Sequence, residues 1–450
     1  MTARSRTLFW VGTVGAHLAT NATAMAQSVV PAPQPTRPAT AVYGPAQPGL
    51  PTAAEALERP PGVSPVLFEA VMVATSEYPD IAGRKLALRA AADDVRAAKG
   101  QRLPSLGVQG VAIGAGDGLG SQVVIDQPLY SFGRIGANIS RAQAQRQVRA
   151  AEVDESVQRI ALDTITAYFD IGRLSARLVV LKSTIDEQQF LVDSIARRVA
   201  QEVSPLVDLS LAQSRLAQTR QETALTAAQR DATLARLDQL LGTTQIDLGL
   251  VPQYDPGLHH PDPANAIEQA IACSPRRDRL IAEALVAKAE AKQAEAAILP
   301  QLSLQFSYNN LIGSRVGLGV SAATQGGLSG FANASAARLR RSSVELSVAT
   351  AERELREQVR ADLVENAATR ERITSSSTST ATTQSVTESF QRQYLAGRRT
   401  WLDVMNAVRE GSAARLSEYD AKFTAMASAT RLLVRTCRWQ PQPSIARMEP

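Results

Sequence analysis

The sequence predicts a mainly α-helical fold built from two copies of one helix, β-hairpin, long helix and helix unit. Long stretches within residues 135–201 and 330–440 contain no proline and keep helical spacing, as long helices do. Short stretches before each of them alternate apolar and polar residues, which favours strands. Equivalent motifs then recur about 195 positions apart. Together these observations predict an internally duplicated α/β architecture.

Composition narrows the classes of function. The chain has 450 residues, a formal net charge of +5 and only 4% aromatic residues. Acidic and basic residues alternate along helical faces and form no basic block, so a nucleic-acid partner is not expected. No run of eighteen apolar residues follows the N-terminus, so no transmembrane helix is predicted.

The N-terminal segment resembles a secretory signal. Arg4 and Arg6 precede an apolar part, and Ala24-Met25-Ala26 forms a small-x-small cleavage site. A disordered terminus is the alternative. Residues 27–65 then hold ten prolines, a composition that cannot build a core and favours an extended tether.

The first repeat opens at Val66. A helical pattern over Ile81–Arg102 stops at Leu103-Pro104, and the sequence then predicts a β-hairpin over residues 105–129 with a turn at Gly114–Gly118. A long helix follows over Ile135–Gln201, with a heptad seam that predicts coiled-coil packing: Ile171, Leu174, Leu178, Leu181, Ile185, Gln188, Val192, Ile195 and Val199. Pro205 is expected to make the next turn, and a shorter helix runs from it to Leu241.

The second repeat follows the same order. A helical region is broken at Pro275 and ends at Leu299-Pro300, and a β-hairpin is expected over residues 302–324. A second long helix begins near Gly330, and Gly397 is read as the tip of its hairpin because glycine reaches positive φ at little cost. The polar stretch Thr374–Ser385 fits either a linker or a helix with a solvent-exposed face, and its place inside the repeat favours the helix.

The repeat is supported by its registration. Pro79 and Pro275, like Pro104 and Pro300, lie 196 positions apart, and Asp208 and Asp403 lie 195 apart. The predicted organisation is a signal peptide at 1–26, a Pro-rich segment at 27–65, a first repeat at 66–245 with a tip near 202–205, a linker at 246–262, a second repeat at 263–438 with a tip near 397, and a C-terminal tail at 439–450.

The four predicted strands imply an assembly. Leu302, Leu304, Phe306 and Tyr308 alternate with polar residues, so one face of the strands would meet lipid and the other water. Four strands cannot close a barrel, and an open sheet leaves backbone groups unsatisfied in lipid. Three chains would supply twelve strands. The expected assembly is therefore a trimeric α/β barrel, in which a small membrane β-barrel continues into a helical tunnel.

The sequence resembles the TolC-like outer membrane efflux and secretion channels. The resemblance covers roughly residues 66–438 and rests on the order of elements and on a set of motifs: Leu103-Pro104, Gln127-Pro128-Leu129, Leu299-Pro300, Gln325-Gly326-Gly327 and Tyr394–Asn406. It implies a homotrimeric channel with a barrel in the outer membrane and a helical tunnel across the periplasm. It also implies no catalytic activity, a periplasmic adaptor, and an inner-membrane ABC or proton-driven transporter. Type I secretion and tripartite efflux both remain open.

The resemblance also implies a gate. Tyr394 and Arg399 in the second tip would face Asp208 from the first tip as a closed-state latch, because both side chains can donate hydrogen bonds to a carboxylate. Asp403 would line the pore constriction, where three copies concentrate negative potential. The second acid usual in the family is Asn406 here, which weakens the expectation of cation block. Ordinary surface charge and a helix N-terminal acid are the simpler alternatives.

The hairpin tips would contact the adaptor through Val203, Ser204, Pro205, Gly397 and Arg398.

Cys273 and Cys437 are the only cysteines, and in an oxidising periplasm they either pair or stay as buried thiols. No cofactor, metal ligand set or enzyme site is predicted from the residues. The main rival function is a periplasmic adaptor, and a further one is a coiled-coil scaffold without a pore. Two hairpins and two strand pairs argue against the adaptor.

Overall fold

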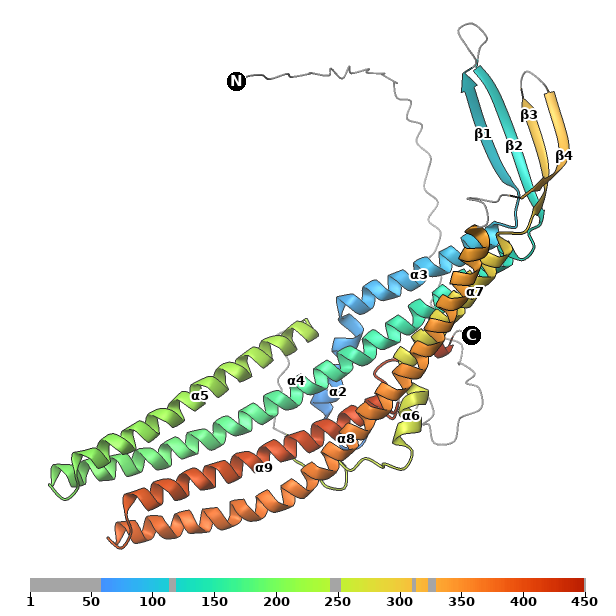
Figure 1. Ribbon diagram of the computed structural model, residues 1–450. Helices are drawn as coiled ribbons and strands as arrows, with labels where there is room; N and C mark the ends of the chain where they lie inside the picture. Colours follow the sequence, from blue (N-terminus) through green and yellow to red (C-terminus); the bar gives the residue numbers. More distant parts are fainter. Residues whose placement is uncertain (1–57, 113–118, 243–251, 310–312, 323–328, 449–450) are drawn as a thin grey trace, which may run out of the picture. The chain divides into compact units, whose positions relative to one another are not determined.

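The computed structural model describes residues 58–112, 119–242, 252–309, 313–322 and 329–448 (Figure 1). Several expectations lie outside these residues: the signal peptide, most of the Pro-rich segment, the Gly114–Gly118 turn, part of the linker and the Gln325-Gly326-Gly327 motif. The described chain is mainly helical and contains one small sheet.

The order of elements repeats. The first set is α2 Pro65–Glu77, α3 Pro79–Gly100, β1 Ser105–Ala112, β2 Leu119–Tyr130, α4 Arg134–Ala200 and α5 Leu206–Leu241. The second set is α6 Ala266–Cys273, α7 Pro275–Ala296, β3 Gln301–Asn309, β4 Gly313–Ser321, α8 Ser329–Leu395 and α9 Trp401–Arg435, followed by the short α10 Ile445–Met448. The long helices α4 and α8 each contain 67 residues, roughly 100 Å at 1.5 Å per residue.

Helix boundaries follow local chemistry. Ser64 and Ser274 are N-caps whose hydroxyls accept from the backbone N–H groups of Leu67 and Arg277, and a proline follows each cap. The predicted break at Pro275 is therefore a capped helix start. Pro79 makes the equivalent break between α2 and α3.

The Ser/Thr-rich stretch of α8 is helical throughout. Most of its hydroxyls donate to a carbonyl three or four residues earlier, as from Thr378 to Thr374 (3.1 Å), Thr382 to Thr378 (2.9 Å) and Thr383 to Ser379 (2.8 Å). These bonds satisfy the donating hydroxyls within the helix itself. The linker alternative is wrong for this stretch.

The strands form one antiparallel sheet in the order β1-β2-β3-β4. Phe306 is paired with Ile125 on one side and Val316 on the other, and Leu304 is paired with Leu318. Because paired residues share a face, these side chains make one exposed apolar face. On the opposite face Asp126 accepts hydrogen bonds from Ser303 (3.1 Å) and Gln305 (2.8 Å).

The helices pack as two long hairpins against each other. Helix α4 contacts α5, α7 and α9, and α8 contacts α9 and α7 (Figure 1). Where α2, α4 and α9 meet, a core cluster contains Leu67, Ile165, Phe169, Phe423 and Met426. In the part of the chain that the structure describes, no helix has the length and apolarity needed to span a membrane.

The predicted C-terminal tail is part of this core. Trp439 is 0% exposed and its ring stacks on that of Phe68 of α2, with 5.9 Å between ring centroids. Beyond it, Gln442 donates to the carbonyl of Thr75. The residues after α9 therefore tie the end of the second repeat to the start of the first.

Candidate gate at the ends of the helical hairpins

The first hairpin ends in a tight turn between α4 and α5. Glu202 adopts a left-handed conformation (φ 58°), and the N–H of Val203 donates to the carbonyl of Arg198 (2.8 Å). The expectation that Pro205 makes this turn is wrong. Pro205 is extended and is the N-cap residue of α5, while Glu202 takes the conformation that glycine would adopt more easily.

The second hairpin ends in the equivalent turn. Gly397 has φ 71°, and the N–H of Arg398 donates to the carbonyl of Gln393 (2.9 Å). Thr400 then caps α9: its hydroxyl accepts from the N–H of Asp403 (3.2 Å). The two turns thus share one geometry, built on Gly397 in one copy and on Glu202 in the other.

A buried cluster lies just behind the two turns. It combines residues of all four long helices, namely Leu191, Val192, Ile195, Ala212, Leu216, Tyr394, Val404, Met405 and Val408. Tyr394 is only 2% exposed, and its hydroxyl lies 3.2 Å from that of Ser194 on α4. The guanidinium of Arg198 lies over its ring, 5.1 Å from the centroid. The Tyr394 side chain therefore joins the two hairpins.

Arg399 and Asp403 lie together on the second hairpin. The guanidinium of Arg399 lies 4.0 Å from the ring centroid of Phe390 and 3.6 Å from a carboxylate oxygen of Asp403. The Thr400 hydroxyl donates to the same carboxylate (2.9 Å). Asn406 is exposed one turn further along α9, so it shares a helix face with Asp403. These contacts suit a helix N-terminal acid and leave the carboxylate partly open to solvent.

The structure of one chain does not bring Asp208 together with Tyr394 or Arg399. Asp208 is half-buried in the first turn of α5, and its carboxylate has no hydrogen-bond or ion-pair partner among the described residues. The Tyr394 hydroxyl contacts that of Ser194 instead, and Arg399 pairs with Asp403 of its own hairpin. The latch that the sequence suggests would therefore need a rearrangement or a second chain.

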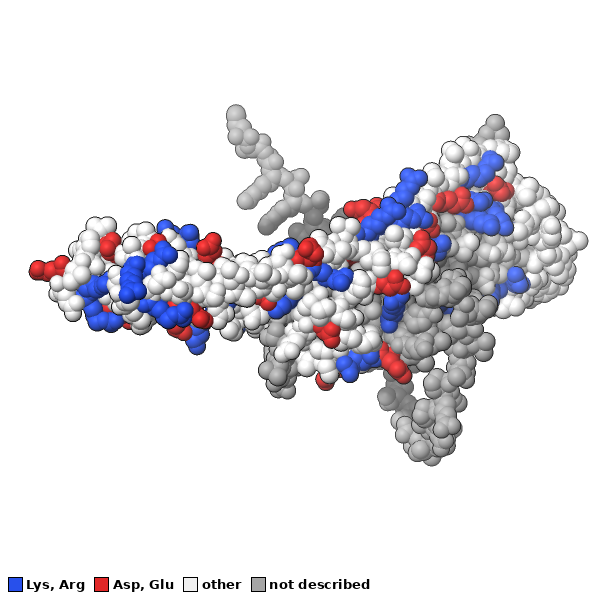
Figure 2. All heavy atoms as spheres, turned by 90° about the horizontal axis from the view of Figure 1, so that it is seen from below, with Lys and Arg blue, Asp and Glu red and all other residues white. Residues whose placement is uncertain are grey.

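The predicted adaptor-contacting residues are largely exposed. Val203 is 66% exposed, Pro205, Gly397 and Arg398 are exposed, and Ser204 is half-buried. Figure 2 shows acidic and basic side chains mixed at this end of the molecule, at the left of the view. A partner that binds the tips would meet both signs of charge and an apolar side chain.

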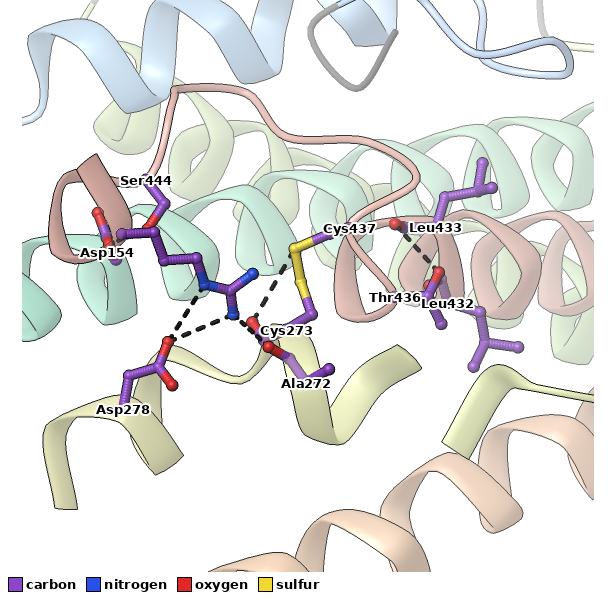
Figure 3. The surroundings of a disulfide bond; sticks show 10 residues. Asp154, Ala272, Cys273, Asp278, Leu432, Leu433, Thr436, Cys437 and Ser444 are labelled. Atoms are coloured by element: carbon purple, nitrogen blue, oxygen red, sulfur yellow. Dashed lines mark hydrogen bonds and ion pairs between the residues drawn. A yellow bond between two sulfur atoms is a disulfide. The ribbon is translucent and has the colours of Figure 1, made fainter. Parts of the chain in front are cut away.

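A disulfide closes the base of the second hairpin. Cys273 at the end of α6 is bonded to Cys437 after α9, with 5.9 Å between their Cα atoms, so the alternative of two thiols is wrong (Figure 3). Arg447 of α10 lies beside it, donating to the carbonyl of Ala272 and pairing with Asp278 (3.3 Å). The C-terminal segment is thus anchored on both sides of the disulfide.

Sequence reasoning missed a buried carboxylate next to this disulfide. Asp154 of α4 accepts from the Ser444 hydroxyl (2.6 Å) and from the N–H groups of Ile445 (2.9 Å) and Ala446 (3.0 Å). Burial raises the pKa of Asp154, and these three hydrogen bonds only partly offset that effect. The partners lie about 290 residues apart, so no local pattern marks them.

Comparisons with known proteins agree on one group. The family model described as "Outer membrane efflux protein" matches residues 71–243. The outer membrane efflux protein BepC of Brucella suis biovar 1 (strain 1330) is 28% identical over 208 residues, 43% of this chain and 45% of the relative. The alignment thus spans less than half of that relative's length.

Solved structures extend the likeness to most of the chain. A membrane protein from Pseudomonas aeruginosa matches with TM-score 0.75 at 18% identity, covering 90% of this chain and 98% of that one. CusC, a protein described as forming a transmembrane channel, matches with TM-score 0.72 at 16% identity, covering 88% of this chain and 99% of that one. At these identities the likeness establishes the fold.

Proposed function

We propose that the chain belongs to the outer membrane efflux protein family, whose model matches residues 71–243, and that three copies of it form a channel through the outer membrane. The channel is the exit duct of a type I secretion or tripartite efflux system, and it has no catalytic activity of its own. A periplasmic adaptor and an inner-membrane ABC or proton-driven transporter supply the substrate. The alternative that the chain is itself an adaptor is not favoured, because the matching family model and the curated relative are both described as outer membrane efflux proteins.

The observation that carries this proposal is the sheet with two free edges. Strands β1 and β4 each pair with one neighbour only among the described residues. A free edge is unfavourable in lipid, because its N–H and C=O groups lack partners there. Pairing β4 of one chain with β1 of the next would satisfy both edges, and three chains would close a twelve-stranded barrel.

The two faces of the sheet give the barrel its orientation. The apolar face with Leu304, Phe306 and Tyr308 would meet lipid, and the face with Ser303 and Gln305 would line the lumen. Single cysteines at Gln305 and Phe306 test this arrangement in intact cells. We expect a water-soluble thiol reagent to label the cysteine at position 305 and not the one at 306. Equal labelling of the two positions would contradict the barrel.

The hairpin tips would be the docking surface for the adaptor. Helix α4 begins at the strand end of the chain and runs roughly 100 Å to its tip, so the tips lie far from the barrel. Photocrosslinkers at Ser204 and Arg398 should capture the adaptor, and one at Gly313 in the sheet should not. Capture from position 313 alone would reverse the proposed orientation.

Fractionation tests the proposal as a whole. The full chain should be found in the outer membrane, require detergent for extraction, and migrate as a trimer that heating dissociates. Reconstituted into planar bilayers, it should give discrete conductance steps. A detergent-independent monomer in the periplasmic fraction would refute the channel.

A further inference from the structure

A hollow of about 1150 Å³ lies where the helices meet the sheet. Its walls come from the end of α3, the start of α4 and the end of α7, and they include Leu103, Phe132 and Leu299. These three apolar side chains are exposed in the chain. The gate and the disulfide do not involve this hollow.

The hollow is strongly basic. Arg96, Lys99, Arg102 and Lys292 line it, against a single acid, Glu295. Arg96 pairs with Asp93, and Glu295 lies 3.7 Å from Arg338. Within the described residues, the side chains of Lys99, Arg102 and Lys292 have no hydrogen-bond or ion-pair partner, whereas arginines in the middle of the helical bundle such as Arg177, Arg277 and Arg279 are paired with acids. Three unpaired cations therefore face one space.

The hollow is linked to the apolar face of the sheet through two aromatic rings. Tyr130 is paired with Leu302, so its ring lies on the same face as Leu304 and Phe306. The ring of Phe132, which lines the hollow, contacts that of Tyr130 edge to face, with 4.6 Å between centroids. Tyr130 and Phe132 thus connect the apolar face of the sheet with the hollow that the cations line.

Phe132 is held there in an unfavourable conformation. Its φ of 47° lies in the left-handed region that bulky side chains avoid, yet its ring is 41% exposed. Ordinary burial in the core does not explain an aromatic ring kept in this way. Backbone strain that presents a side chain to the outside is typical of binding sites.

We propose that this hollow binds the phosphate-bearing head group of an anionic phospholipid from the periplasm-facing leaflet of the outer membrane. Lys99, Arg102 and Lys292 hold the phosphate, and the acyl chains lie along Leu103, Phe132 and the apolar face of the sheet. The aromatic pair marks the level of the membrane interface. This assignment rests on the proposed function, because it needs the sheet to lie in the membrane. The bound lipid would fix how deeply the barrel is inserted.

The test uses the full chain purified in detergent, with phosphatidylglycerol or phosphatidylethanolamine added and bound lipids counted by native mass spectrometry. The variant Lys99→Gln/Arg102→Gln/Lys292→Gln removes the three cations. Its matched control, Lys182→Gln/Arg372→Gln/Arg409→Gln, removes the same charge from exposed side chains outside the hollow that are also without partners among the described residues.

We expect the parent and the control to prefer phosphatidylglycerol, and the hollow variant to bind it about tenfold more weakly. An excess of inorganic phosphate should not displace the lipid, since the acyl chains contribute to binding. Equal binding by the parent and the hollow variant overturns the assignment even if the protein forms channels. Displacement by phosphate alone assigns the hollow to free anions and also overturns it. If the parent binds phosphatidylglycerol as expected but forms no channels in planar bilayers, the proposed function is refuted and the lipid site is not.

Discussion

The hydroxyl groups of Tyr394 on α8 and Ser194 on α4 lie 3.2 Å apart, which links the two helical hairpins just behind their tips. The contact is partly buried: Tyr394 is 2% exposed, Ser194 is half-buried, and Arg198 from α4 covers the tyrosine ring. Tyr394, which we propose as a member of a closed-state latch, thus already joins the hairpins within a single chain. Asp208, the acid proposed as its partner, does not contact it there.

Removing this link should loosen the closed state. Tyr394→Phe deletes one hydrogen bond worth roughly 0.5–1.5 kcal/mol, and with Arg399→Ser it removes the polar side chains that hold the second tip. We expect the double variant to form a stable trimer with a higher single-channel conductance in planar bilayers. Tyr419→Phe is the matched control, because Tyr419 is more exposed and its hydroxyl has no partner among the described residues.

Two further variants separate the partners of the latch. If the Tyr394–Ser194 link within one chain stabilises the closed state, Ser194→Ala should reproduce the rise in conductance. If contacts of Asp208 with a neighbouring chain stabilise it, Asp208→Asn should raise the conductance instead. If the Tyr394→Phe/Arg399→Ser variant conducts like the parent, the proposed latch is wrong.

Asp403 should set the ion preference of the entrance. Its carboxylate is held by Thr400 and Arg399 at the start of α9, on one face with Asn406. Asp403→Asn removes the charge and keeps an acceptor for Thr400, so the fold should lose only about 0.3–1 kcal/mol per chain. We expect a clear fall in cation preference, read from reversal potentials in a salt gradient, with a smaller change in conductance. Unchanged reversal potentials would place Asp403 outside the constriction.

Packing between the hairpins should depend on Gly172 of α4. A Cβ atom at Gly172 would lie 2.6 Å from the ring of Phe423, which is buried in the core. Gly172→Ala should therefore destabilise the chain by roughly 1–3 kcal/mol. At Gly83 of α3 a Cβ atom meets nothing within 4 Å, so Gly83→Ala should stabilise by about 0.5–1 kcal/mol. Thermal unfolding in detergent compares the two, and a stable Gly172→Ala variant would contradict this packing.

Much of the fold could be predicted because its determinants are local. The proline-free stretches predicted the long helices α4 and α8, and the heptad seam supported α4. The alternation of apolar and polar residues predicted the paired strands. The first tip was misjudged because Glu202 takes a left-handed conformation that sequence rules reserve for glycine and asparagine. Here the surrounding turn overrides the preference of the residue.

The candidate site could be predicted only in outline. Its residues were placed at the correct tips, yet the partners of Tyr394 and Asp154 lie 200 and 290 positions away, where no spacing rule reaches. The predicted contacts of Asp208 with Tyr394 and Arg399 are not made within one chain. Physical pairing across such distances depends on how the helices pack, and the sequence pattern specifies only which faces are apolar.

The buried Asp154 should give the C-terminal anchor a pH dependence. Burial is the main cause of its raised pKa, so between its ordinary value near 3.8 and the raised value the folded chain binds more protons than the unfolded one. The stabilisation from protonation is thus complete below about pH 3.8 and is lost as the pH rises through the folded pKa. Asp154→Asn is neutral throughout and keeps an acceptor for Ser444. The stability of the parent relative to this variant should therefore fall as the pH rises, measured by urea unfolding between about pH 3 and 7.

Asp80 is the control of opposite sign. A hydrogen bond from Ser156, followed by one from Arg84, holds the pKa of Asp80 below its ordinary value. Its contribution is therefore present above the ordinary value and is lost as the pH falls through the folded pKa. The parent should gain stability relative to Asp80→Asn as the pH rises, by a small amount because the pair is partly exposed. Parallel pH profiles for the two variants would show that Asp154 is not the buried anchor of the C-terminal segment.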